Sequence, residues 1–130
     1  MKINLILFAI FIFIVSYIGC KDTTAGIDDT IIPSSNVSFG KYIQPLFLTK
    51  CANSGCHDDA TRAGGYSLTS WVGATELDIV VPKNPNNSLL YQTVERIPGV
   101  PPMPPVGYSA LTTNQIAGIK TWIDEGAQNN

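Results

Sequence analysis

A proline-rich segment limits what the second half of the chain can form. Residues 98–105 read Pro-Gly-Val-Pro-Pro-Met-Pro-Pro, which places five prolines within eight residues. Proline fixes its own φ and has no N–H to donate, so this segment is excluded from regular helix and from the interior of a sheet. The chain must therefore carry a stiff, irregular loop here. Long loops are uncommon in a small domain unless they line a functional site.

Helical patterns precede this loop. Apolar residues recur at roughly helical spacing over residues 39–47 and predict a helix, with Pro45 either in its first turn or at a kink. A short helical turn is expected around Trp71. Ser88 is placed to cap another short helix over residues 89–95.

The clearest helix is the last one. Thr112 or Thr113 caps it, and it ends near Gly126. Its apolar residues are Ile116, Ile119, Trp122 and Ile123. The sequence shows no internal repeat and no alternating strand pattern of any length. It therefore predicts an all-α fold of three or four helices joined by long loops.

The N-terminal residues indicate export from the cytoplasm. Lys2 precedes an almost wholly apolar stretch, the pattern of a signal peptide over residues 1–19. A permanent anchor helix is the alternative, and both interpretations place the rest of the chain outside the cytoplasm. Gly19-Cys20 resembles the end of a bacterial lipobox, which predicts that Cys20 is acylated and tethers the chain to a membrane. Ordinary cleavage nearby, or a free Cys20, are the other possibilities.

The remaining chain divides into a linker and one domain. Residues 20–37 are rich in polar side chains and read as a flexible tether, which leaves residues 38–128 as the folded domain. The whole chain has 8 Lys+Arg and 10 Asp+Glu, a formal net charge of −2. Because no basic stripe is present, nucleic acid is excluded as an expected partner.

Residues 51–57 contain the candidate cofactor-binding residues. They read Cys-Ala-Asn-Ser-Gly-Cys-His, and a cysteine pair that ends in Cys-His is typical of covalent haem attachment. The thiols of Cys51 and Cys56 would form thioethers with the haem vinyl groups, and His57 would ligate the iron. The usual gap between the cysteines is two residues, whereas here it is four. Residues five apart lie about 140° apart around a helix, so the segment must bulge.

Two other interpretations of this cluster stay open. In the first, Cys51 and Cys56 form a disulfide in an extracytoplasmic binding module without haem, and His57 has no role in the site. Alternatively, the two cysteines and His57 supply three ligands of a zinc site.

Met103 is the candidate for the second axial ligand. It is the only methionine left after signal cleavage, and proline pairs flank it on both sides. A methionine that only fills a core would more often lie on a helix face. Haem electron carriers often place a methionine sulfur opposite the histidine.

With these residues in place, the chain resembles a small class I-like c-type cytochrome domain, of the planctomycete type, on a bacterial lipoprotein. The resemblance covers about residues 37–127. Its matching segments are Tyr42–Phe47 before the cysteine pair, Val81-Pro82 with Pro85 and Ser88–Tyr91, Pro102–Pro105, and the C-terminal helix with Trp122–Ala127. The resemblance implies a cytochrome c-like bundle of three to four helices with long loops around one covalently bound haem c.

The resemblance also implies a function. His57 and Met103 would leave the iron no open site, so the chain would carry single electrons between redox proteins through transient contacts at the cell envelope. No enzymatic activity and no small-molecule substrate are expected. The chain would lie on the periplasmic or the cell-surface side of the membrane. A haem sensor or peroxidase becomes possible if Met103 is not a ligand. Arg62 is a candidate partner for a haem propionate. Asp58 and Asp59 either belong to a solvated loop or adjust the haem site through their charge.

Overall fold

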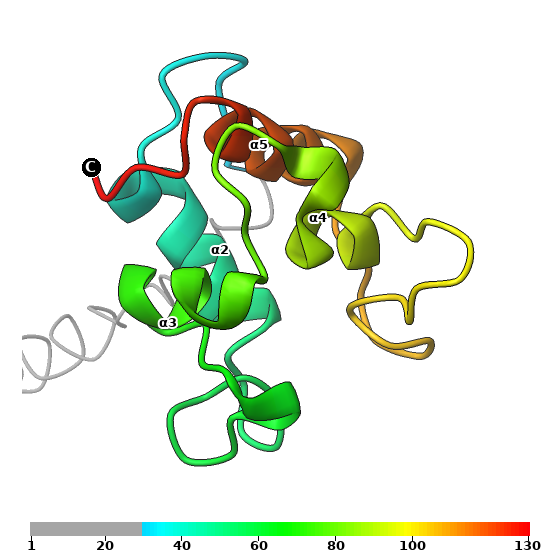
Figure 1. Cartoon of the computed structure of the whole chain (residues 1–130). Helices are drawn as coiled ribbons and strands as arrows, with labels where there is room; N and C mark the ends of the chain where they lie inside the picture. Colours follow the sequence, from blue (N-terminus) through cyan, green and yellow to red (C-terminus); the bar gives the residue numbers. More distant parts are fainter. Residues whose placement is uncertain (1–29) are drawn as a thin grey trace, which may run out of the picture.

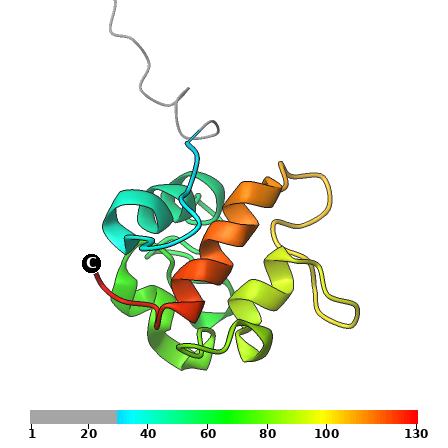
Figure 2. The ribbon, with the colours of Figure 1, turned by 90° about the horizontal axis from the view of Figure 1, so that it is seen from above.

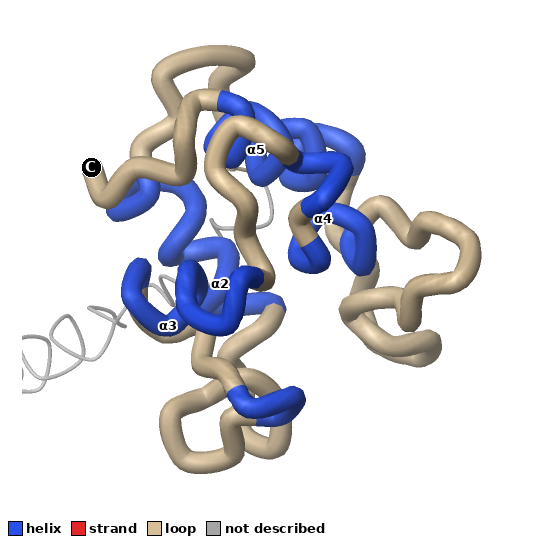
Figure 3. The backbone as a smooth tube through the Cα atoms, viewed as in Figure 1, coloured by secondary structure: helices blue, strands red, loops and turns tan. Residues whose placement is uncertain are grey.

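The computed structural model describes residues 30–130 and contains helices without any strand in that range (Figures 1 and 3). The α-helices are α2 (Gln44–Lys50), α3 (Trp71–Thr75), α4 (Leu89–Val94) and α5 (Thr113–Asp124). A π-helical turn, η2 (Phe39–Ile43), leads into α2, and three 3₁₀ turns follow: η3 (Ala63–Gly65), η4 (Glu76–Asp78) and η5 (Pro85–Asn87). The all-α fold class predicted from the sequence is confirmed.

The first helical segment accommodates Pro45 in the opening turn of α2. Ser38 caps η2, because its hydroxyl accepts a hydrogen bond from the Lys41 N–H at 3.2 Å. Proline is tolerated in a first helical turn, where a missing N–H costs least. Pro45 thus lies in the first turn of the α-helical part, as one of the two predicted arrangements has it, but the π-helical turn η2 precedes it without a break.

Helix α5 organises the core. Thr112 and Gln115 form a capping box at its start, as the sequence predicted for one of the two threonines. Figure 2 shows α5 lying between the η2–α2 segment and α4, and contacts join it to η2, α4 and η5. The Trp122 ring lies 5.4 Å from the ring of Phe39 and 6.4 Å from that of Phe47. These aromatic rings form the centre of the core.

The chain before η2 packs onto α5. Ile32 and Val37 are buried, and the Ile32 N–H donates to Asn114 Oδ1 at 2.8 Å. The Val37 N–H donates to the Glu125 carboxylate at 2.8 Å. The structured part therefore begins before Ser38, inside the segment read as a tether, because two apolar side chains in it find a place on α5. We call residues 30–37 the N-terminal strap.

The predicted signal peptide, residues 1–19, and the predicted acylation site, Cys20, lie outside the described residues. Within residues 30–130, no helix is long and apolar enough to cross a membrane.

Candidate haem-attachment site

The cysteine segment leaves the helix and forms a series of turns. Cys51 ends α2, and its N–H still donates to the Phe47 carbonyl at 2.8 Å. The Cys56 N–H then donates to Asn53, and the His57 N–H reaches back to the Cys51 carbonyl at 3.1 Å. Gly55 has φ +84°, a left-handed conformation that glycine adopts without strain. The bulge that the four-residue gap requires is therefore present, and backbone hydrogen bonds tie Cys51 to His57.

His57 is buried and held by the segment that follows it. Its side chain and backbone together are 8 % exposed, and its carbonyl accepts the Leu68 N–H at 2.8 Å. The imidazole stacks on the Tyr66 ring, with centroids 4.6 Å apart and planes inclined by 12°. Sequence reasoning missed Tyr66. The only local signal was Gly64-Gly65 before it, a pair that marks a tight turn and brings the chain back toward the motif.

Both thiols are free in the structure, with no disulfide between Cys51 and Cys56. Burial raises the pKa of Cys51 to about 12, and the neighbouring Cys56 adds to the shift while Lys50 opposes it. The Cys51 thiol is therefore protonated at neutral pH. The structure therefore does not contain the Cys51–Cys56 disulfide that the alternative interpretation requires.

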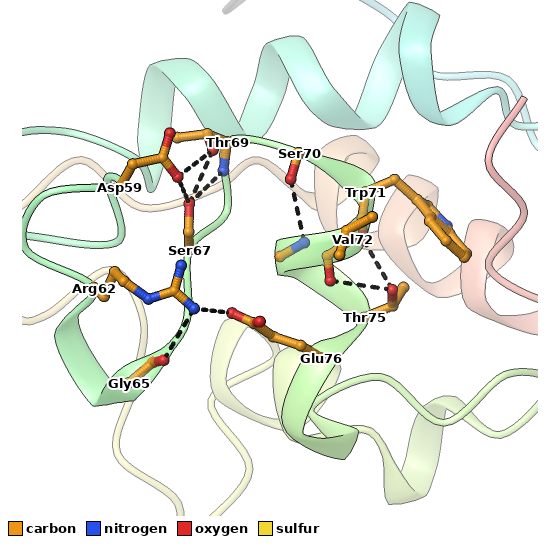
Figure 4. A network of polar contacts seen from close by, with 11 residues as sticks. Asp59, Arg62, Gly65, Ser67, Thr69, Ser70, Trp71, Val72, Thr75 and Glu76 are labelled. Atoms are coloured by element: carbon orange, nitrogen blue, oxygen red, sulfur yellow. Dashed lines mark hydrogen bonds and ion pairs between the residues drawn. The ribbon is translucent and has the colours of Figure 1, made fainter.

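Polar side chains brace the loop between His57 and α3 (Figure 4). Asp59 Oδ1 accepts hydrogen bonds from the Ser67 hydroxyl at 2.6 Å and the Thr69 hydroxyl at 2.8 Å. These bonds lower the pKa of Asp59. Asp58 accepts the Thr61 N–H at 2.9 Å and so closes a tight turn directly after the histidine. Both acidic residues therefore shape the loop.

Arg62 already has a partner in this loop. Its guanidinium forms an ion pair with Glu76 and donates to the Gly65 carbonyl. A haem propionate would have to compete with the Glu76 carboxylate for it, so the expected role of Arg62 at a propionate stays a prediction.

Met103 lies in a separate loop between α4 and α5. Its N–H donates to the Thr93 carbonyl at 3.0 Å, which fixes the loop to α4, and its side chain is partly buried. The Met103–Pro104 peptide bond is cis. Farther along the loop, Ser109 Oγ lies 3.4 Å from Lys50 Nζ, next to Cys51. The loop thus approaches the cysteine segment, while ligation by Met103 itself stays a prediction.

The residues present fit a covalently bound haem. Cys51 and Cys56 offer two free thiols, and His57 follows directly with a buried imidazole. A zinc site has less support, because no group of three or more His, Cys, Asp or Glu side chains in residues 30–130 could hold a metal ion.

Comparison with known families agrees with this donor set. The model of the family Planctomycete cytochrome C matches residues 54–107, a stretch that contains Cys56, His57 and Met103. This match, which covers less than half of the chain, supports a planctomycete-type cytochrome c domain and agrees with the resemblance predicted from the sequence. Cytochrome c domains bind haem and are typically extracytoplasmic. No curated protein and no solved structure matches the chain.

Proposed function

We propose that this chain is a monohaem c-type cytochrome that carries single electrons between redox proteins at the cell envelope. One observation carries the proposal: two free thiols, Cys51 and Cys56, adjoin a buried histidine, His57, within or beside a segment that matches a cytochrome c family. A bound haem c would supply an iron that alternates between the ferric and ferrous states.

Each residue has a role in this proposal. Cys51 and Cys56 would hold the haem through thioether bonds, and His57 would ligate the iron. Met103 would be the second protein ligand, and the proline pairs around it limit how far its sulfur can move. With both ligands bound, small molecules would be excluded from the metal, which favours electron transfer over catalysis or gas sensing.

Covalent haem attachment tests the proposal. After expression with a c-type maturation system, acid-acetone extraction should leave the haem on the chain, and the mass should exceed that of the mature polypeptide by one haem. The control is the double variant Cys51→Ala/Cys56→Ala, which should release its haem into the solvent. Free haem from the wild type, or an unaltered mass with a Cys51–Cys56 disulfide, would rule the function out.

We further propose that Cys20 carries the membrane anchor. Acyl chains embed in a bilayer with about 0.8 kcal/mol for each buried methylene. Metabolic labelling with a clickable fatty acid should mark the wild type and leave Cys20→Ala unlabelled. Labelling that persists in the variant, or that never appears, would remove the lipid anchor from the proposal.

A further inference from the structure

The Nδ1 atom of His57 lacks the interaction that normally orients a metal-binding histidine. Ligating histidines almost always donate the second ring N–H to a carboxylate, a carbonyl or water, and this hydrogen bond fixes the plane of the ring. Nδ1 of His57 is buried against protein and has no such partner among the described residues. Nε2 is therefore the nitrogen left for iron, and another contact must hold the imidazole plane.

Tyr66 makes that contact. Its ring lies almost parallel to the imidazole, at 12°, with a centroid separation of 4.6 Å. Rotation of the imidazole about its Cβ–Cγ bond would drive its edge into the Tyr66 ring. The Tyr66 ring also covers one face of the imidazole beside Nδ1, an atom that is itself buried. The stack thus supplies the orientation that a hydrogen bond would otherwise provide, and it adds to the burial of Nδ1.

Tyr66 is itself fixed in place. A Cβ atom added at Gly64 would lie 3.1 Å from Tyr66 Cε1, so the ring packs closely against this glycine, whose φ is +72°. The Leu68 N–H, two residues after Tyr66, donates to the His57 carbonyl. The Asp59 hydrogen bonds to Ser67 and Thr69 brace the same stretch from its other end. Both rings of the stack therefore belong to one braced loop.

We propose that Tyr66 is the positioning residue of the axial ligand: its ring, in place of a hydrogen bond to Nδ1, sets the plane of the His57 imidazole and keeps water from Nδ1. The proposal rests on the proposed function, in that His57 is taken to bind haem iron. Because Nδ1–H has no acceptor, the imidazole donates less electron density than a hydrogen-bonded one, which favours the ferrous state.

The hydroxyl of Tyr66 has no part in orienting His57. This distinguishes the proposed role from functions in which a tyrosine acts through its hydroxyl. Tyr66→Phe keeps the ring, whereas Tyr66→Leu keeps an apolar side chain and removes the stack. Tyr91→Leu is the matched control, because Tyr91 is also partly buried against the core but lies on α4.

The experiment compares these variants as haem-loaded proteins, by the spread of the haem methyl resonances in the ferric ¹H NMR spectrum and by the reduction potential. The methyl spread reports the orientation of the axial imidazole plane. We expect Tyr66→Phe and Tyr91→Leu to match the wild type in both. Tyr66→Leu should change the methyl spread and lower the potential, because water then reaches Nδ1 and strengthens the histidine as a donor.

Several results would overturn the proposal. It fails if Tyr66→Leu keeps the wild-type spread and potential, or if Tyr66→Phe changes them as much as Tyr66→Leu does. If Tyr66→Leu does not accumulate, Tyr66→Met decides: it fills more of the space but removes the flat ring, so it should shift the methyl spread, and an unchanged spread counts against the proposal. Failure of the proposed function is recognised separately, since wild-type protein would then carry no covalent haem.

Discussion

Met103 is the residue on which the redox character of the proposed centre depends. Met103→Ala should keep its covalent haem, because Cys51, Cys56 and His57 are untouched. It should lose the weak far-red band of a ferric Met-ligated haem. Its potential should fall by part of the roughly 0.8 V range that axial ligands span, because methionine sulfur favours ferrous iron. Absorption spectroscopy and potentiometric titration measure both effects.

Val106→Ala is the control for this prediction, since it alters a side chain that is 82 % exposed in the same loop. Its spectrum and potential should equal those of the wild type. If Met103→Ala also keeps a wild-type spectrum and potential, the sixth position is empty or held by another group. A haem sensor or peroxidase would then replace the electron carrier.

Single residues differ in how far the sequence reveals their roles. Adjacency in the chain indicated that Cys56 and His57 act together, and in the structure the Cys56 thiol is free and His57 is buried. Tyr66 gave no such signal, because its contact with His57 depends on the backbone hydrogen bond from Leu68 to the His57 carbonyl. A local pattern cannot specify a contact that a loop creates when it folds back on itself.

The carboxylate of Asp59 braces the loop from His57 to α3. Asp59 accepts hydroxyl bonds from Ser67 and Thr69, and these bonds hold its pKa below the usual value of 3.8. A carboxyl with a lowered folded-state pKa stabilises the fold above its unfolded pKa, and that contribution is lost as the pH falls through the folded value. Asp59→Ala should therefore lower the urea midpoint at neutral pH. The gap to the wild type should close under acid conditions.

Urea titrations at a series of pH values measure this effect. Glu95→Ala serves as the control, because it removes an exposed carboxylate at the end of α4. A gap between Asp59→Ala and wild type that stays constant from neutral pH down to pH values well below 3.8 would show that ionisation of Asp59 is irrelevant.

The N-terminal strap docks where α5 has a glycine. A Cβ atom at Gly118 would lie 2.5 Å from Ile32 Cγ2, far closer than atoms of two side chains approach. Gly118→Ala should therefore displace Ile32 and cost about 1–3 kcal/mol of the free energy of unfolding. Ile32 Cβ would lie 2.8 Å from the added methyl, so the methyl finds room only in an Ile32→Gly background, where that atom is absent too. The same change should then stabilise α5 by up to about 1 kcal/mol, because alanine favours helix over glycine.

A double-mutant cycle measured by urea unfolding checks this change of sign. Additive effects of Ile32→Gly and Gly118→Ala would show that the strap and α5 do not meet at this point.

Elements with local signals were predictable from the sequence, and those set by tertiary contacts were not. Thr112 begins α5 through a capping box whose partner is three residues away. Ser88 precedes α4 as predicted but makes no side-chain cap, because its hydroxyl is buried and donates to the Asn84 carbonyl while accepting the Val81 N–H. The docking of the N-terminal strap depends on Gly118, which is distant in the sequence. The local composition of the strap is polar, and it therefore predicted a linker.

At the scale of the whole molecule, one aromatic cluster joins the two ends of the domain. Phe39 and Phe47 come from the first helical segment, and Trp122 comes from α5. Hydrogen bonds reinforce the same junction, since the Phe39 N–H donates to Asn130 Oδ1 at 2.8 Å. The cysteine segment follows α2 at this junction, and the Met103 loop lies between α4 and α5. A domain of this size buries a small core, so the cluster should dominate its stability.

Trp122 therefore provides the sharpest test of the fold. Its side chain is fully buried, and its Nε1–H donates to the Gln128 carbonyl at 3.0 Å. Trp122→Ala should cost about 3–5 kcal/mol, a large part of the roughly 5–15 kcal/mol that stabilises a typical domain. Trp71→Ala is a matched control: it too removes an indole whose N–H donates to a C-terminal carbonyl, that of Ala127, but from a partly exposed position. Chemical unfolding of the two variants at equal haem content should give a much lower midpoint for Trp122→Ala. Equal midpoints would mean that the indole hydrogen bond, rather than the buried ring, holds the two ends of the domain together.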